Sequence, residues 1–206
     1  VVPFATILAM ANLALGFLAL FLTIRRLMRK DDKAVSRKAD YALLTLLGVS
    51  FLGLTVSLAL RWIVSGNVPL SNGYESMLSV AWFVELLSLL AYRKARIVLV
   101  FGFLLSGFFL LVSHINQMDP AIGPMMPVLN SPLLSVHVSI IMMSYALLSL
   151  TFICALTAVI IHFLTRNAVS KTERDLRAER LEALQVLSRL FLYPSITTMG
   201  LGIFIG

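Results

Sequence analysis

The feature that most constrains this chain is an uncharged run of 28 largely apolar residues, 138–165, between His137 and Arg166. As a helix it is about 42 Å long, which exceeds the ~30 Å of hydrocarbon in a bilayer. We therefore expect a membrane-spanning helix whose outer end lifts His137 to the headgroups or above them. From the residues alone, His137 is either an interfacial polar residue or a ligand for a metal or cofactor.

The composition extends this expectation to the whole chain. It is 59% hydrophobic and 13% charged, with a mean hydropathy of +0.94, whereas soluble domains are about 25% charged. This predicts an all-α, polytopic transmembrane helix bundle, with one membrane domain over residues 1–206. Six segments of suitable length or composition are expected as spans, the last one cut short: 3–24, 41–64, 76–92, 97–113, 133–164 and the segment from 191.

Lys and Arg residues gather in alternate connections between these spans. Connections 25–40, 93–96 and 165–190 hold 7, 3 and 6 of them, which is 16 of the 17 in the chain, and Arg61 is the exception. The positive-inside rule places these connections in the cytoplasm and the two others, with His137, outside. The net charge of +7 is thus explained by topology, and no nucleic-acid partner is expected.

The 165–190 connection is interpreted as an amphipathic cytoplasmic helix that leads into the sixth span. Ser170 and Glu173 form a capping box, and Glu173 can pair with Arg177 one turn later. Its apolar residues share one side: Leu176, Leu184 and Leu187. Such a helix lies on anionic lipid or, alternatively, docks a partner.

The outward segment 61–82 carries turn-forming residues, and Ser71 or Asn72 is expected to cap the next helix. Trp62 suits the membrane interface, and Arg61 and Glu75 flank the loop. Glu85 lies about midway along the third span, where a carboxyl group either pairs within the bundle or stays protonated. No partner for Glu85 can be named from the sequence.

Two motifs resemble a known family. Residues 68–76 read VPLSNGYES and precede Ala81-Trp82, which resembles the PLSNxYES…W signature of the CcsA/ResC family, haem-handling proteins of system II cytochrome c biogenesis. Residues 129–139 read LNSPLLSVHVS and precede Ser144-Tyr145-Ala146, similar to the family stretch that presents an outer-face haem ligand. The CcmC and CcmF proteins of system I share the general plan but not the SNxYES stretch.

The resemblance implies non-covalent haem b as cofactor and His137 as an axial ligand of the haem iron, facing the cavity under the SNGY turn. Secondary candidates for the haem site lie in the outer segments: His114, Arg61, Trp62, Tyr74 and Glu75. We expect Arg61 and Glu75 to form an ion pair with each other, and the alternative is a contact between Arg61 and a haem propionate. The family's tryptophan-rich loop, a second outer histidine and a membrane-embedded histidine are absent, and by spacing we expect all of them beyond Gly206. The fragment alone is therefore not expected to be an active enzyme.

The function implied is the haem-handling subunit of a cytochrome c synthase (haem lyase) in the bacterial inner membrane, with its haem site on the periplasmic face. It would carry haem outward for thioether attachment to a CxxCH apocytochrome c, beside a CcsB/ResB-like partner that is separate or fused. Two alternatives stay open: a system I-type haem exporter without attachment activity, and a non-haem transporter in which Glu85 lies on the transport path. The single cysteine, Cys154, excludes an internal disulfide and a CxxC pair, and we expect it to be a buried packing residue.

Overall fold

The protein is described by a computed structural model that covers residues 2–28, 33–70, 72–114, 132–164 and 171–206. Within these ranges the secondary structure is helical, without strands, which confirms the predicted all-α bundle. The helices follow the chain as α1 (Val2–Met28), α2 (Lys33–Ser65), α3 (Gly73–Ala91), α4 (Val98–His114), α5 (Pro132–Leu164) and α6 (Lys171–Ile205).

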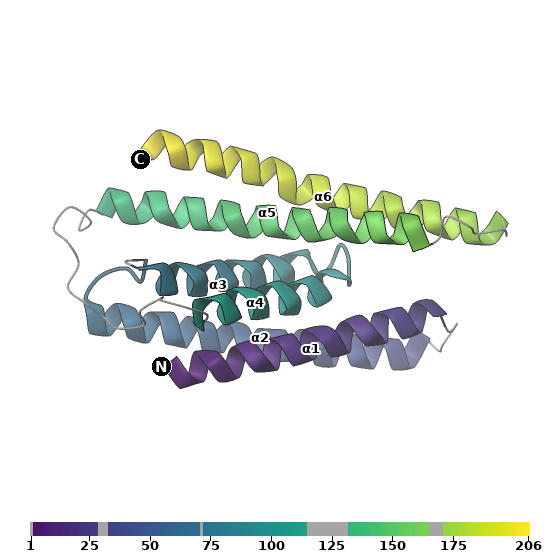
Figure 1. Ribbon diagram of the computed structural model, residues 1–206, viewed down its shortest axis with the longest axis horizontal. Helices are drawn as coiled ribbons and strands as arrows, with labels where there is room; N and C mark the ends of the chain where they lie inside the picture. Colours follow the sequence, from purple (N-terminus) through teal and green to yellow (C-terminus); the bar gives the residue numbers. More distant parts are fainter. Residues whose placement is uncertain (1, 29–32, 71, 115–131, 165–170) are drawn as a thin grey trace.

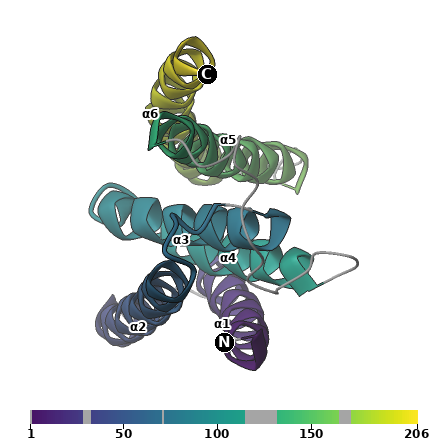
Figure 2. The same ribbon diagram turned by 90° about the vertical axis from the view of Figure 1, so that its left-hand side faces the viewer.

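The helices form three layers of pairs, α1 with α2, α3 with α4, and α5 with α6 (Figures 1 and 2). Helix α4 packs between α1 and α3, α5 contacts α3, and α6 packs mainly along α5. The turn after α2 and the start of α5 lie at one end of the bundle, and the α3–α4 turn lies at the other (Figure 1). By the charge rule used above, we name the first the outer end and the second the inner end.

Large apolar side chains cover the outside of the outer layers. Ile7 on α1, Ile63 on α2 and Phe204 on α6 are 68%, 79% and 90% exposed. Five helices are long and apolar enough to cross a membrane, and α4 is a shorter apolar helix of 17 residues. At about 25 Å, α4 falls slightly short of the hydrocarbon thickness, but it lies inside the bundle. The chain is therefore a multi-pass membrane protein.

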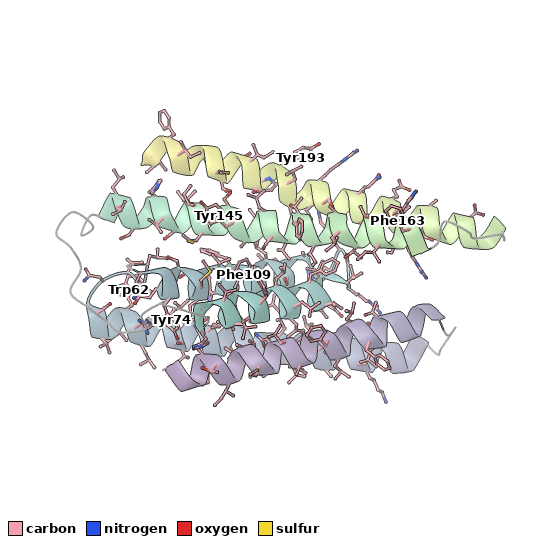
Figure 3. The ribbon with its side chains drawn as sticks, in the orientation of Figure 1. Trp62, Tyr74, Phe109, Tyr145, Phe163 and Tyr193 are labelled. Carbon is pink, nitrogen blue, oxygen red and sulfur yellow. The ribbon has the colours of Figure 1, made fainter. Side chains whose placement is uncertain are left out.

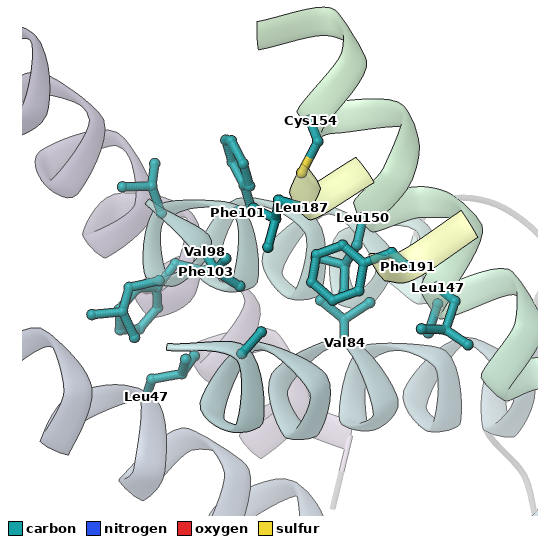
Figure 4. Close-up of a cluster of buried hydrophobic side chains, with 14 of the residues drawn as sticks. Leu47, Val84, Val98, Phe101, Phe103, Leu147, Leu150, Cys154, Leu187 and Phe191 are labelled. Atoms are coloured by element: carbon teal, nitrogen blue, oxygen red, sulfur yellow. The ribbon is translucent and has the colours of Figure 1, made fainter. Parts of the chain in front are cut away.

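The interior is dominated by a cluster of buried apolar side chains that joins α3 and α4 to α5 and α6. Val84, Phe101, Leu150 and Phe191 all contribute to it (Figure 4). Cys154 is fully buried in the same cluster, so its predicted packing role is confirmed.

Reciprocal glycines allow α1 and α4 to approach backbone to backbone. A Cβ atom on Gly16 would lie 3.0 Å from the backbone nitrogen of Leu104, and one on Gly107 would lie 2.9 Å from that of Leu13. Small residues at such crossings are typical of membrane helix pairs. The close approach brings polar side chains of α1 and α4 into one interior site, described below.

The amphipathic segment and the sixth span form one continuous helix, α6, with Pro194 inside it. Leu184 and Leu187 are buried in the core, so the part of the predicted apolar side that the structure describes packs against the protein's own bundle. Ser170 and the side chains of Glu173, Leu176 and Arg177 lie outside the described residues. The change from a charged to an apolar sequence near residue 190 therefore falls within one helix and does not mark a break between two helices.

Candidate functional site

The loop that joins α2 to α3 is shaped by its turn residues. Gly66 ends α2 with a φ of +69°, the left-handed conformation that glycine adopts without strain. Asn72 caps α3, since its Oδ1 accepts a hydrogen bond from the Glu75 backbone N–H at 2.9 Å. The capping role predicted for Ser71 or Asn72 is therefore confirmed for Asn72, and the cap directs Tyr74 and Glu75 into the bundle.

Arg61 and Glu75 form a buried ion pair at the outer end. Arg61 Nε lies 3.1 Å from Glu75 Oε1, and the two side chains are only 2% and 1% exposed. The Arg61 guanidinium carbon also lies 4.9 Å from the centroid of the Tyr74 ring, a cation–π contact. The expected ion pair is confirmed. The Glu75 carboxylate neutralises the charge of Arg61, the one basic residue outside the three connections assigned to the cytoplasm.

His114 joins the same group from the end of α4. Its ring lies edge-on to Tyr74, with 5.8 Å between centroids, and its Nε2 is 3.2 Å from Thr6 Oγ1 on α1. Arg61, Tyr74, Glu75 and His114 therefore constitute one outer polar cluster that links α2, α3 and α4. Trp62 lies near the same end of the molecule as Tyr74 (Figure 3).

A mainly apolar groove of about 280 Å³ lies beneath residues 68–70, between α2, α3 and α5. Trp62 is 54% exposed and forms part of its wall. Trp82 forms another part and is held in place, because its Nε1–H donates to Thr55 Oγ1 at 2.8 Å and its ring stacks on Phe51. From α5, Ser139 reaches this groove.

His137 lies elsewhere, half-buried between α5 and α6. Its Nδ1 is 2.6 Å from the carbonyl oxygen of Gly202 on α6, and a Cβ atom on Gly206 would overlap the imidazole ring. Two residues apart on a helix differ by about 200° in direction, so His137 points away from the groove that Ser139 lines. The expectation that His137 faces the cavity under the SNGY turn is therefore wrong.

Glu85 is fully buried at the centre of the bundle, where the sequence could name no partner. Its Oε1 accepts hydrogen bonds from Asn12 Nδ2 and Ser50 Oγ, both at 2.8 Å, and Asn12 Nδ2 also lies 3.0 Å from Ser106 Oγ. These three partners come from α1, α2 and α4. The available signal was that each apolar span carries a few polar residues, Asn12, Ser50 and Ser106 among them, and the sequence does not say which of these meet.

Comparison with known proteins identifies the family. The family described as "Cytochrome C assembly protein" matches residues 70–206, more than half of the chain. This chain belongs to the cytochrome c assembly family. It is thereby a protein of cytochrome c biogenesis.

Individual relatives agree with this assignment. Protein NrfI of Wolinella succinogenes is 34% identical over 152 residues, which are 74% of this chain and 16% of NrfI. The cytochrome c biogenesis protein CcsA of Synechococcus is 34% identical over 144 residues, 66% of this chain and 46% of that protein. The CcsA protein of Arabidopsis thaliana is 28% identical over 127 residues, 56% of this chain and 37% of the relative. The chain therefore spans less than half the length of each of these proteins.

The match to the cytochrome c assembly family begins in the loop after α2, so it includes Tyr74, Glu75, His114 and His137. Arg61 precedes it, although the structure pairs Arg61 with Glu75. The structure thus separates the candidate residues into the outer polar cluster, the groove beside Trp62, and His137 on the α5–α6 face. Within the described part of the chain, no three His, Cys, Asp or Glu residues are placed to hold a metal ion.

Proposed function

We propose that this protein holds haem at the outer end of its membrane domain and presents it for thioether attachment to a CxxCH apocytochrome c, with His137 as one axial ligand. The observation that carries the proposal is the hydrogen bond between His137 Nδ1 and the Gly202 carbonyl. A carbonyl only accepts, so Nδ1 carries the proton and Nε2 of the neutral ring keeps its lone pair. Metal-binding histidines commonly donate their second N–H to a carbonyl in this way.

The surroundings of His137 support a site on the α5–α6 face. A Cβ atom on Gly206 would overlap the imidazole ring and one on Gly202 would overlap Ile141, so the absence of both side chains lets the end of α6 approach α5 closely at His137. The ring is held by its Nδ1 hydrogen bond, and Nε2 has no hydrogen-bond partner among the described residues. We propose that haem b, bound non-covalently, supplies the iron and the vinyl groups that react with the cysteines. The protein's own part is to orient the haem through a fixed imidazole.

The secondary candidates divide by their present contacts. Trp62 is exposed at the groove, on the side of α5 opposite His137, so we propose it as an apolar contact for the arriving apocytochrome rather than for the haem. Arg61, Tyr74, Glu75 and His114 already contact one another. We therefore propose that these four shape the outer end and fix the loop rather than touch the haem directly.

The wider assignment follows the family. We propose a bacterial inner-membrane location with the outer end facing the periplasm, a CcsB/ResB-like partner, and residues 1–206 as one membrane domain. Purified full-length protein mixed with haem and an apocytochrome peptide tests the attachment step. Covalent haem on the peptide supports a synthase, whereas haem release without attachment supports an exporter of the system I type.

The ligand role is tested with His137→Ala in the full-length protein. We expect the haem absorbance of the purified protein to fall to a small fraction of the wild-type value, and added imidazole to restore part of it. Ser139→Ala is the matched control, because Ser139 lies two residues away on the opposite side of α5. Unchanged haem content and spectrum in His137→Ala would refute the ligand role.

A further inference from the structure

Glu85 occupies a position that the proposed haem site does not use. It lies on α3 with 0% exposure, and its partners Asn12, Ser50 and Ser106 are at most 4% exposed. The hydrogen bonds from Asn12 and Ser50 both go to Oε1. Oε2 is buried and has no hydrogen-bond partner among the described residues.

An ionised carboxylate in this setting would be strongly unfavourable. Half of its charge would rest on an oxygen without a donor, in the interior of a membrane protein, where unpaired charge is costly. A proton on Oε2 removes that charge and leaves Oε1 as the carbonyl oxygen that accepts both hydrogen bonds. The observed geometry is therefore that of a neutral carboxylic acid.

The other buried carboxylates of the bundle have counter-charges. Glu75 is paired with Arg61 near the outer end, and Asp40 is paired with Arg96 at 3.1 Å near the inner end. Ser50, which contacts Glu85, is 11 residues from Arg61 and 10 from Asp40 along α2, so both pairs are about 15 Å away. No Lys, Arg or His takes part in the described contacts of Glu85.

The same contacts disfavour a bound metal cation. A hard cation requires oxygen lone pairs directed at it. Here the Asn12 amide nitrogen and the Ser50 hydroxyl both direct hydrogens toward Glu85 Oε1. The site is arranged to hold a protonated acid.

We propose that Glu85 is a proton-binding site at the centre of the α1–α4 bundle, and that its Oε2 proton exchanges with water at the outer end. Two further buried groups, Ser57 Oγ and Tyr74 Oη, lack hydrogen-bond partners within the described residues. Ser57 lies on α2 between Ser50 and the outer end, and Tyr74 belongs to the outer polar cluster. Buried polar groups of this kind are normally satisfied by internal water. Along α2, Leu54 lies between Ser50 and Ser57, and along α3, Leu78 lies between Tyr74 and Glu85; both leucines are fully buried. Exchange therefore requires this apolar layer to open and is slow.

Infrared spectroscopy of the full-length protein tests the protonation. The wild type should show the carbonyl-stretch band of a carboxylic acid, lost in Glu85→Gln and shifted to lower frequency after transfer to D₂O. Asp40→Asn is the matched control, because Asp40 is also a buried carboxylate but is paired with Arg96, so the band should persist. Absence of the band in the wild type, or its persistence in Glu85→Gln, would overturn the proposal.

Chemical labelling of the wild type gives a second test that does not depend on how the variants fold. Dicyclohexylcarbodiimide reacts with protonated carboxyl groups in apolar surroundings, so mass spectrometry should find the adduct on Glu85, whether or not sodium ions are present. No adduct on Glu85, or protection by sodium, would contradict a proton site.

The exchange route is tested by measuring how fast the carbonyl band shifts after the protein is transferred to D₂O. We expect the double variant Ser57→Ala/Tyr74→Phe to slow this shift several-fold while the band keeps its position. An unchanged rate would refute the route through the outer end. None of these measurements involves haem. The proton site can therefore be refuted while the proposed haem function stands, and the haem function can be refuted while the proton site stands.

Discussion

The buried ion pair at the outer end gives a quantitative prediction. Replacing Glu75 with Gln leaves the Arg61 guanidinium, now 2% exposed, without its carboxylate partner. Breaking a buried pair in this way costs about 3–5 kcal/mol. For a chain of this size, each kcal/mol shifts Tm by about 2–4 °C, so we expect Tm to fall by about 6–20 °C.

The assay is thermal unfolding of the purified protein in detergent, with Asp40→Asn as the control. In that second pair Arg96 is 57% exposed, so water solvates the remaining cation and the loss should be at most about 1 kcal/mol. The double variant Arg61→Met/Glu75→Leu should recover most of the stability, because apolar side chains can replace a buried pair. If Glu75→Gln were no more destabilising than Asp40→Asn, the reasoning from burial would be refuted.

Two further predictions concern packing. Gly107→Ala should destabilise the protein by about 1–3 kcal/mol, because its Cβ atom would lie 2.9 Å from the Leu13 backbone nitrogen. Gly48→Ala adds a Cβ atom with nothing within 4 Å, so it should instead stabilise α2 by about 0.5–1 kcal/mol. Thermal unfolding compares the two variants, and equal effects would contradict the close α1–α4 approach. Cys154 is 0% exposed, so the folded protein should resist a water-soluble maleimide until it is denatured. The variant Ile63→Cys, at a position 79% exposed near the outer end, should react at once, and rapid labelling of Cys154 would show that the core is open.

Features that depend on local composition could be predicted from the sequence. Apolar length and the distribution of basic residues located the spans and the alternating ends, because each reflects a property of one segment. The cap at Asn72 also follows from side chains close in sequence. For Arg61 and Glu75, opposite charge predicted an ion pair, with a contact between Arg61 and a haem propionate as the alternative. The structure shows the ion pair.

Features that depend on direction around a helix could not be predicted. The run after His137 is uncharged throughout, so no polar face indicates which side of α5 meets α6 and which meets the groove. The partners of Glu85 come from three other helices. Their meeting depends on how the helices pack, including the close α1–α4 approach that the glycines allow. The sequence predicts an amphipathic helix that leads into the sixth span, and the structure shows the two as one helix, because helical hydrogen bonds continue where the surroundings of the helix change.

The unbroken course of α6 has a mechanical consequence for His137. From Lys171 to Gly202 the helix extends 31 residues, or about 46 Å, at a rise of 1.5 Å per residue. A rotation or a shift of α6 near Lys171 would therefore be carried along the helix to the Gly202 carbonyl, which is hydrogen-bonded to His137 Nδ1. Pro194 lacks a backbone N–H and removes one helical hydrogen bond eight residues before Gly202. A bend at Pro194 would change the direction of the Gly202 carbonyl while the part of α6 before Pro194 stays in place.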